Sequence, residues 1–379
     1  MTVVVVLGGS FAGLQVALEL SGRVEVVLVD PRDYWEFTPS IHTALCGDRD
    51  PSQLLTPLDG FLAKVKFVQA AATRVGEKSV FLSNGQEVGF DFLVVATGCS
   101  YPEPVRAIEP TREKRLAALD AARARLRNKK VVVVGGGAVG VEVAGELGSN
   151  CILATNAREL VPDCPEATRT KALSTLLAMG VRVVLECRVA EGEEGKCELR
   201  TKDGVVETIE GVECLWCFGG KPNASFMPPE LLDARGFVKI DEGSRRCTPT
   251  IYAVGDVAAK PDAQRLASYA HLEGEYVAHH ILSSSSSEGG NNNTAPYAPP
   301  PRFVALSFGP TNGAFVYDAT PLPIPGRAIP YLKALIERWF IRLLPMPYAI
   351  LKLLPGDPKA RAWAKKQHKS TPAVAVATT

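Results

Sequence analysis

The sequence contains two copies of one arrangement, in which a short apolar strand runs into a glycine-rich turn and then a helix. The first strand, Val3 to Leu7, enters the turn Gly8 to Gly13, and the second, Val131 to Val134, enters Gly135 to Gly140. Strands made only of apolar residues are typical of a parallel sheet covered on both faces. A strand, a glycine turn and a helix in this order are typical of a dinucleotide site, because the helix N-terminus faces the pyrophosphate. We therefore predict an α/β fold with two dinucleotide-binding units.

The first unit also has the second strand that a dinucleotide site needs. This strand runs from Val24 to Val29 and ends in Asp30. Gly8 permits the tight turn, Gly13 lets the helix and strand pack closely, and the acid accepts the hydroxyls of the adenosine ribose. Ser10 stands at the middle glycine position, where its small side chain can donate a hydrogen bond to a phosphate. The alternative is a glycine-rich turn in an unrelated α/β protein.

The second unit keeps all three signature glycines, Gly135, Gly137 and Gly140. Its following strand, Cys151 to Thr155, does not end in an acid, and Asn156 and Arg158 come directly after it. An acid there would repel a 2′-phosphate, so its absence beside an arginine favours NADPH or the use of both nucleotides. In the alternative, Arg158 is a solvated loop charge and NADH is held by other contacts. A chain with two dinucleotide sites usually moves electrons between them.

Three further motifs resemble those of pyridine nucleotide–disulfide oxidoreductase-type flavoproteins. They are the strand and turn at residues 91–98, the strand at residues 215–223 and the Gly-Asp motif at residues 250–256. Their order is that of the family. The resemblance implies a glutathione-reductase-like fold, with two Rossmann-like domains, the NAD(P)H domain inserted in the FAD domain and a small C-terminal α+β module.

The resemblance also implies which residues bind each cofactor. Those expected to contact FAD are Gly8, Gly9, Ser10, Phe11, Ala12, Gly13, Asp30, Arg32, Ala72, Ala96, Thr97, Gly98, Gly255 and Asp256. Those expected to contact NADPH or NADH are Gly135, Gly137, Ala138, Val139, Gly140, Glu142, Asn156, Arg158, Gly219 and Gly220. Glu142 resembles the acid that positions nicotinamide, and it can equally be a helix N-terminal acid that faces the dipole.

Within this superfamily the sequence is most similar to ferroptosis-suppressor and apoptosis-inducing-factor-like flavoproteins and to type II NADH dehydrogenases. That resemblance implies hydride transfer from NAD(P)H to FAD, followed by transfer of two electrons to a quinone. Two alternatives remain open. One is a reductase of a small carrier protein such as a rubredoxin or ferredoxin, and the other is a redox-responsive signalling flavoprotein. Tyr269, which follows the Gly-Asp motif, is a candidate for lining a quinone site.

The cysteines do not indicate a disulfide reductase. The pair Cys214 and Cys217 lies on a strand, so we interpret both as buried thiols, with a redox or metal role left open. We expect no bound metal. Cys46 and Cys99 have no specific support as redox residues. His279 and His280 are expected to be solvated at a helix end, and His42 and His271 to be structural or near the flavin.

The C-terminal part of the sequence changes in composition. Residues 283–301 are rich in serine, asparagine and proline, which predicts a flexible loop. The segment at residues 330–369 combines an aromatic, leucine-rich helix with basic residues such as Lys333, a pattern typical of peripheral membrane contact. The alternatives are docking on the flavin domain and a homodimer interface. The predicted divisions are 1–105 and 246–282 for FAD, 106–245 for NAD(P)H, 302–370 for the C-terminal module and 371–379 for a disordered tail.

Charge and the N-terminus limit the remaining function classes. The formal net charge is +1, so nucleic-acid binding has no electrostatic support. The sequence has neither a signal-peptide pattern nor an apolar run long enough to span a membrane. We expect a cytoplasmic protein, with a membrane or lipid-droplet surface as its site of peripheral contact.

Overall fold

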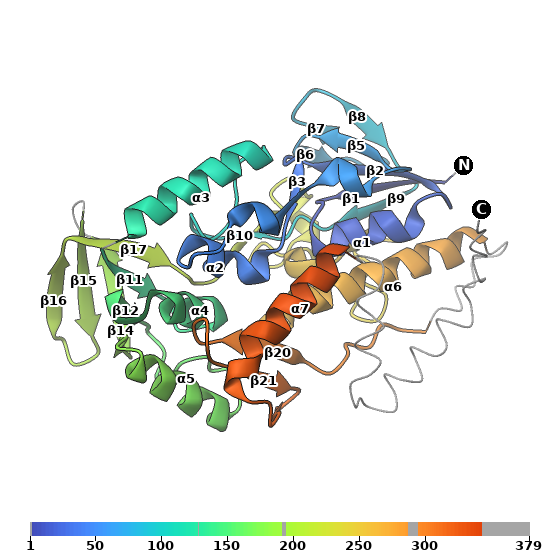
Figure 1. Ribbon diagram of the computed structural model, residues 1–379. Coiled ribbons are helices and arrows are strands. Elements are labelled where there is room, and N and C mark those ends of the chain that lie inside the picture. Colours follow the sequence, from blue (N-terminus) through green and yellow to red (C-terminus); the bar gives the residue numbers. More distant parts are fainter. Residues whose placement is uncertain (1, 128, 192–194, 287–294, 343–379) are drawn as a thin grey trace, which may run out of the picture.

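The structure is a computed structural model that describes residues 2–127, 129–191, 195–286 and 295–342 (Figure 1). Its first sheet is parallel, with the strand order β19-β9-β1-β2-β5. These strands are β1 (Val3–Leu7), β2 (Glu25–Asp30), β5 (Lys66–Gln69), β9 (Phe92–Val95) and β19 (Ile251–Ala253). Two helices, α1 (Phe11–Leu20) and α6 (Ala267–Ser286), lie against each other beside this sheet. They approach so closely that a Cβ atom on Gly274 would lie 2.4 Å from the carbonyl oxygen of Ala12.

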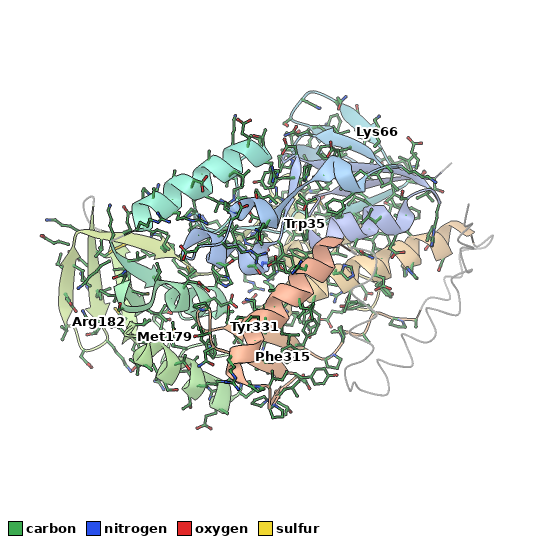
Figure 2. All side chains as sticks on the ribbon, viewed as in Figure 1. Trp35, Lys66, Met179, Arg182, Phe315 and Tyr331 are labelled. Atoms are coloured by element: carbon green, nitrogen blue, oxygen red, sulfur yellow. A yellow bond between two sulfur atoms is a disulfide. The ribbon has the colours of Figure 1, made fainter. Side chains whose placement is uncertain are left out.

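The second parallel sheet is built between β9 and β19 in the sequence and has the order β13-β12-β11-β17. Its strands are β11 (Lys130–Val134), β12 (Cys151–Ala154), β13 (Arg182–Val184) and β17 (Val212–Trp216). The helices of this part are α4 (Ala138–Leu147) and α5 (Glu166–Ala178), with α3 (Arg112–Leu126) leading into it. Because the first sheet is completed by β19, the second unit is an insertion in the first. Lys66 and Arg182 mark the two opposite ends of the molecule, and Trp35 lies between them (Figure 2).

Smaller antiparallel elements surround the two sheets. They are β3 (Tyr34–Glu36) with β4 (Leu55–Pro57), β6 (Ala72–Val75) with β7 (Ser79–Leu82) and β8 (Glu87–Gly89), and β14 (Cys187–Glu191) with β15 (Lys196–Thr201) and β16 (Val206–Glu210). Strands β10 (Cys99–Ser100) and β18 (Lys221–Pro222) pair antiparallel and tie the two units together. The short helix α2 (Ile41–Leu45) follows β3.

The C-terminal module consists of β20 (Phe303–Ser307), β21 (Gly313–Tyr317), β22 (Thr320–Pro321) and helix α7 (Ile329–Arg342). Helix α7 crosses the middle of the molecule, between the two sheet-containing parts (Figure 1). Its inner face carries the polar residues Lys333 and Glu337, and Glu337 is fully buried against Arg49. This module therefore packs on both nucleotide units.

The predicted fold class is confirmed: two parallel α/β units, one inserted in the other, precede a small C-terminal module. Residues 287–294 of the predicted loop, residues 343–369 of the predicted membrane segment and the predicted tail lie outside the described residues. No helix in the part of the chain that the structure describes is long and apolar enough to cross a membrane.

Candidate active site between the two nucleotide units

Residues of both units line one cavity of about 710 Å³. This volume is within the range of ligand sites, roughly 300–1,000 Å³. It is lined by residues from both glycine turns, from the ends of β9 and β19, and from β20 and α7. The residues predicted to contact FAD that line it are Gly8, Ser10, Phe11, Ala12, Asp30, Arg32, Ala72, Ala96, Thr97, Gly98, Gly255 and Asp256. Gly9 and Gly13 are buried in the same turn and do not line the cavity.

The first glycine turn has the geometry that a diphosphate requires. Gly8 has φ +101°, a conformation that favours glycine, and a Cβ atom on Gly13 would lie 1.8 Å from the carbonyl oxygen of Gly8. Helix α1 begins at Phe11, and the side chain of Ser10 makes no capping hydrogen bond. The N–H groups of the first helical turn therefore point into the cavity without a side-chain cap, which suits an anionic phosphate group.

Asp30 closes β2 beside this turn and is almost fully buried. Its carboxylate accepts hydrogen bonds from the backbone N–H of Gly9 at 2.7 Å and of Arg32 at 2.8 Å. The guanidinium of Arg32 lies 3.2 Å from the same carboxylate, and this interaction is the main reason that the pKa of Arg32 is raised. Asp30 and Arg32 thus form a fixed polar pair at the adenosine end of the predicted site.

Residues that follow β9 and β19 form another part of the cavity wall. The Thr97 hydroxyl donates to the carbonyl oxygen of Asn223 at 2.6 Å, and the Asn223 amide donates to the carbonyl oxygen of Thr97 at 3.0 Å. The hydroxyl of Tyr101 lies 3.4 Å from the carboxylate of Asp256, and Arg265 donates to the backbone carbonyl of Asp256. Sequence motifs identified Thr97 and Asp256. Asn223 ends the motif at residues 215–223 but was not assigned to the site, and Tyr101, which follows the motif at residues 91–98, was missed.

The second glycine turn repeats the backbone geometry of the first. Gly135 has φ +123°, and a Cβ atom on Gly140 would lie 1.8 Å from the carbonyl oxygen of Gly135. Helix α4 begins after Gly137, again without a side-chain cap, and Ala138 and Val139 line the shared cavity. Both uncapped helix ends therefore lie at one cavity.

Glu142 lies in the cavity within a cluster of polar groups from four segments. Its carboxylate accepts from the Lys333 ammonium at 2.5 Å and from the backbone N–H of Ser307 at 3.1 Å. His42 Nδ1 lies 3.7 Å from the same carboxylate, and His42 Nε2 lies 3.2 Å from the Ser307 hydroxyl. Lys333 also donates to the carbonyl oxygen of Pro39 at 3.3 Å. The sequence motif identified Glu142, but its partners come from distant segments.

The charges in this cluster are fixed by burial and by the ion pair. Burial acts to raise the pKa of Glu142, but the attraction of Lys333 and His42 outweighs it, so the pKa is lowered. Burial lowers the pKa of His42, Glu142 opposes the change and Lys333 adds to it, so that the pKa is about 4. At neutral pH the cluster therefore holds a Glu142 carboxylate and a neutral His42 imidazole beside Lys333.

The other residues predicted to contact NAD(P)H lie outside the lining of this cavity. Asn156 is exposed, and the Arg158 side chain is 81% exposed, with its Nε 3.4 Å from the Glu186 carboxylate. Gly220 packs against β10, where a Cβ atom would lie 2.7 Å from the carbonyl oxygen of Ser100, whereas Gly219 faces open space. Asn156 and Arg158 follow β12, the position at which an adenosine ribose would be read.

Tyr269 does not line the cavity, although Leu266, Ala267 and Ala270 of the same segment do. Its ring is buried, and its hydroxyl donates to the carbonyl oxygen of Pro300 at 3.0 Å. The structure therefore does not bring Tyr269 together with the other predicted site residues, and its contact with a quinone stays a prediction.

The cysteines and histidines require two corrections. Cys214 is not a buried free thiol, because it forms a disulfide with Cys197 across β17 and β15. His280 is not solvated: it is buried, and its Nδ1 lies 2.9 Å from the Tyr252 hydroxyl because α6 packs against β19. Among the described residues, no group of three or more histidine, cysteine, aspartate or glutamate side chains could hold a metal ion.

Comparisons with known proteins agree with the two-unit fold. The family model described as "Pyridine nucleotide-disulphide oxidoreductase" matches residues 2–274. Ferroptosis suppressor protein 1 of Taeniopygia guttata is 28% identical over 305 residues, which cover 74% of this chain and 80% of that protein. The structure of NDH2 from Plasmodium falciparum in complex with NADH is similar with a TM-score of 0.74 and 15% identity, covering 90% of this chain and 94% of that one. The sulfide:quinone oxidoreductase of Aquifex aeolicus has a TM-score of 0.73 and 18% identity, covering 90% and 91%.

Proposed function

The chain belongs to the pyridine nucleotide-disulphide oxidoreductase family, and on that premise we propose that it passes electrons from NAD(P)H through FAD to a quinone. The observation that carries the proposal is the single cavity that both glycine turns share with Glu142 and Lys333. The balanced reaction takes NAD(P)H, a proton and a quinone to NAD(P)+ and a quinol. The chemistry that FAD supplies when bound is two-electron transfer between the nicotinamide and this acceptor.

The residues of the chain bind and orient the reactants. In our proposal the N–H groups of α1 and the Asp30–Arg32 pair hold FAD, while the N–H groups of α4 hold the diphosphate of NAD(P)H. Glu142, fixed by Lys333 and Ser307, lies at the cavity end of α4 and orients the nicotinamide. Such positioning lowers the barrier because the reactants are held in place before the reaction starts.

A small-molecule acceptor is favoured over a dithiol because the cavity contains no cysteine pair. Of the described residues that line it, Cys99 is the single cysteine. Burial raises the pKa of the Cys99 thiol to about 11, so it is protonated at neutral pH and is a poor nucleophile. A sulfide:quinone oxidoreductase is among the proteins with a similar fold, which also supports a quinone.

The test is anaerobic reduction of the flavoprotein by NADPH or NADH, followed by rapid mixing with a short-chain ubiquinone. We expect fast loss of the oxidised-flavin absorbance and fast recovery after the quinone is added. Reduction without recovery would overturn the quinone proposal and would point to a carrier protein or to a signalling role. Comparison of kcat/KM for NADPH and NADH in the same assay decides which nucleotide is preferred.

We also propose that the outer face of α7 contacts a membrane surface, where quinones are dissolved. Tyr331 is 78% exposed and Leu335 is 62% exposed, and they lie one helical turn apart, opposite to the buried Glu337. Large apolar side chains on an exposed helix face suit the boundary between lipid headgroups and acyl chains. The variant Tyr331→Ser/Leu335→Ser is expected to weaken binding to anionic liposomes without changing reduction by NAD(P)H. Unchanged liposome binding would contradict this role.

A further inference from the structure

A cluster of three buried charges lies behind the cavity wall and has no part in the site described above. Glu273 of α6 is fully buried, and Arg245 and Lys260 are almost fully buried. The Glu273 carboxylate lies 2.8 Å from the Lys260 ammonium and 3.2 Å from the Arg245 guanidinium. Buried charges are costly unless they are paired, so three of them in one place require a structural or functional explanation.

The cluster is connected to the cavity by one hydrogen bond. The second carboxylate oxygen of Glu273 accepts from the backbone N–H of Gly255 at 2.7 Å. Gly255 has φ +74° and directly precedes Asp256, and both residues line the cavity. Glu273 therefore holds, from behind, the turn that presents the Asp256 side chain to a ligand.

The cluster also fixes Glu273 from several segments at once. Arg245 is a non-glycine residue with φ +59°, and its guanidinium lies 4.2 Å from the centre of the Tyr297 ring. Residues in this left-handed conformation persist only where their surroundings determine them. Arg245 before β19 and Lys260 after it thus hold one carboxylate, and Tyr297 before β20 packs against Arg245. These contacts give the Gly255 turn a rigid support.

We propose that Glu273 is a positioning residue for FAD, which acts by anchoring the Gly255–Asp256 turn through a charged hydrogen bond. Arg245 and Lys260 pair with the Glu273 carboxylate and hold it in place. The proposal rests on FAD as the cofactor and is independent of the acceptor, so failure of the quinone assay would leave it intact. A carboxylate makes a stronger bond to a backbone N–H than an amide does, so its charge matters as well as its shape.

The experiment measures the FAD dissociation constant of the apoprotein by the quenching of flavin fluorescence, together with the visible spectrum of bound FAD and the Tm of the apoprotein. For Glu273→Gln we expect FAD to bind about tenfold more weakly, with a shifted visible spectrum, because the turn loses its charged anchor. The matched control is Glu337→Gln, which removes another fully buried carboxylate, paired with Arg49, at a distance from the turn. We expect this control to lower the Tm and to leave FAD affinity within about twofold, well below the roughly tenfold loss that a charged hydrogen bond represents.

Two outcomes would overturn the proposal: unchanged FAD affinity and spectrum in Glu273→Gln, or an equal loss of affinity in both variants. If Glu273→Gln does not fold, the double variant Glu273→Gln/Lys260→Met restores the net charge of the cluster and supplies a folded protein. That variant is still expected to bind FAD more weakly than the parent chain. Parent-like affinity and spectrum in the double variant would equally contradict the anchoring role.

Discussion

The two glycine turns of this chain have the same backbone and different surroundings. A Cβ atom on the third glycine would lie 1.8 Å from a carbonyl oxygen in both, and the first glycine has a positive φ in both. In the first turn, however, Phe11 and Ala12 are buried, whereas the matching Ala138 and Val139 of the second turn are exposed. The start of the helix after the glycine turn is therefore buried in the first unit and exposed in the second. A closed site suits a resident cofactor, and an open site suits a nucleotide that enters and leaves in each cycle.

The polar side chains around the two turns also differ. Asp30 ends β2, but Thr155 follows β12 at the matching position, so only the first unit has an acid for the ribose. Gln15 in α1 matches Glu142 in α4, so only the second unit places a charge at the cavity end of its helix. The backbone thus makes a general diphosphate site, and the side chains decide which nucleotide binds and which end reacts.

The largest expected effect comes from adding one methyl group to each turn. Gly13→Ala and Gly140→Ala would each place an atom inside a backbone contact, which costs more than roughly 3 kcal/mol if the turn cannot move. We expect Gly13→Ala to be purified without flavin. Gly140→Ala should keep its flavin, and this flavin should be reduced by dithionite but not by NAD(P)H. Absorbance spectra measure both, and loss of flavin from Gly140→Ala would contradict the division of roles.

The next prediction gives α4 the glutamine that α1 has at the matching position. Glu142→Gln leaves the Lys333 ammonium without its counter-charge and removes the carboxylate from the cavity. We expect flavin reduction by NAD(P)H to slow roughly 10- to 100-fold, which corresponds to about 1.4–2.7 kcal/mol in the barrier, while the flavin content is unchanged. Stopped-flow absorbance measures the rate. An unchanged rate would show that Glu142 serves the helix rather than the nicotinamide.

A smaller effect is expected when Thr155 is replaced by aspartate, the residue type that the first unit has at the matching position. Thr155→Asp would place a carboxylate where a 2′-phosphate is read, and like charges repel. We expect kcat/KM for NADPH to fall about tenfold, or about 1.4 kcal/mol, with little change for NADH. Steady-state kinetics with both nucleotides measure the change. Equal losses for the two nucleotides would mean that the side chain disturbs the turn and not the recognition of the phosphate.

The smallest effect concerns Glu146, which matches Glu19 of the first helix. Burial raises the pKa of Glu146, Lys333 opposes the change, and the carboxylates of Glu142 and Asp48 add to it, so that the pKa is about 7. Because the folded pKa lies above the ordinary value of 4.5, this group destabilises the fold as pH rises from about 4.5 to about 7. Glu146→Gln should therefore raise the Tm by a few degrees at pH 8 and not at pH 4.5. An equal change at both pH values would contradict this explanation.

Much of the fold was predictable because its signals are local. The strands Val3 to Leu7 and Val131 to Val134 are continuous apolar runs, and each ends in a turn that only glycine can form. Local patterns of this kind identify the element and the backbone site together.

The partners in the site were not predictable because they come from remote segments. Lys333 is separated from Glu142 by 191 positions, and it lies in a helix whose basic residues suggested lipid contact. A signal was present, since Lys333 and Glu337 are four positions apart and therefore lie on one face of a helix rich in apolar residues. His280 and Cys214 were misassigned for a related reason, because burial and pairing depend on which elements pack together.

The insertion of the second unit has a consequence for biosynthesis. The first sheet needs β19 beside β9, and Leu93 pairs with Ile251, which leaves the ribosome 158 residues later. At roughly 5–20 residues per second, the edge of β9 waits about 8–30 seconds for its neighbour. During that interval the inserted unit can fold on its own strands, while the unpaired edge is open to aggregation. A slow translation step within residues 217–250 would lengthen this wait and lower the yield of folded protein, even though the amino-acid sequence would be unchanged.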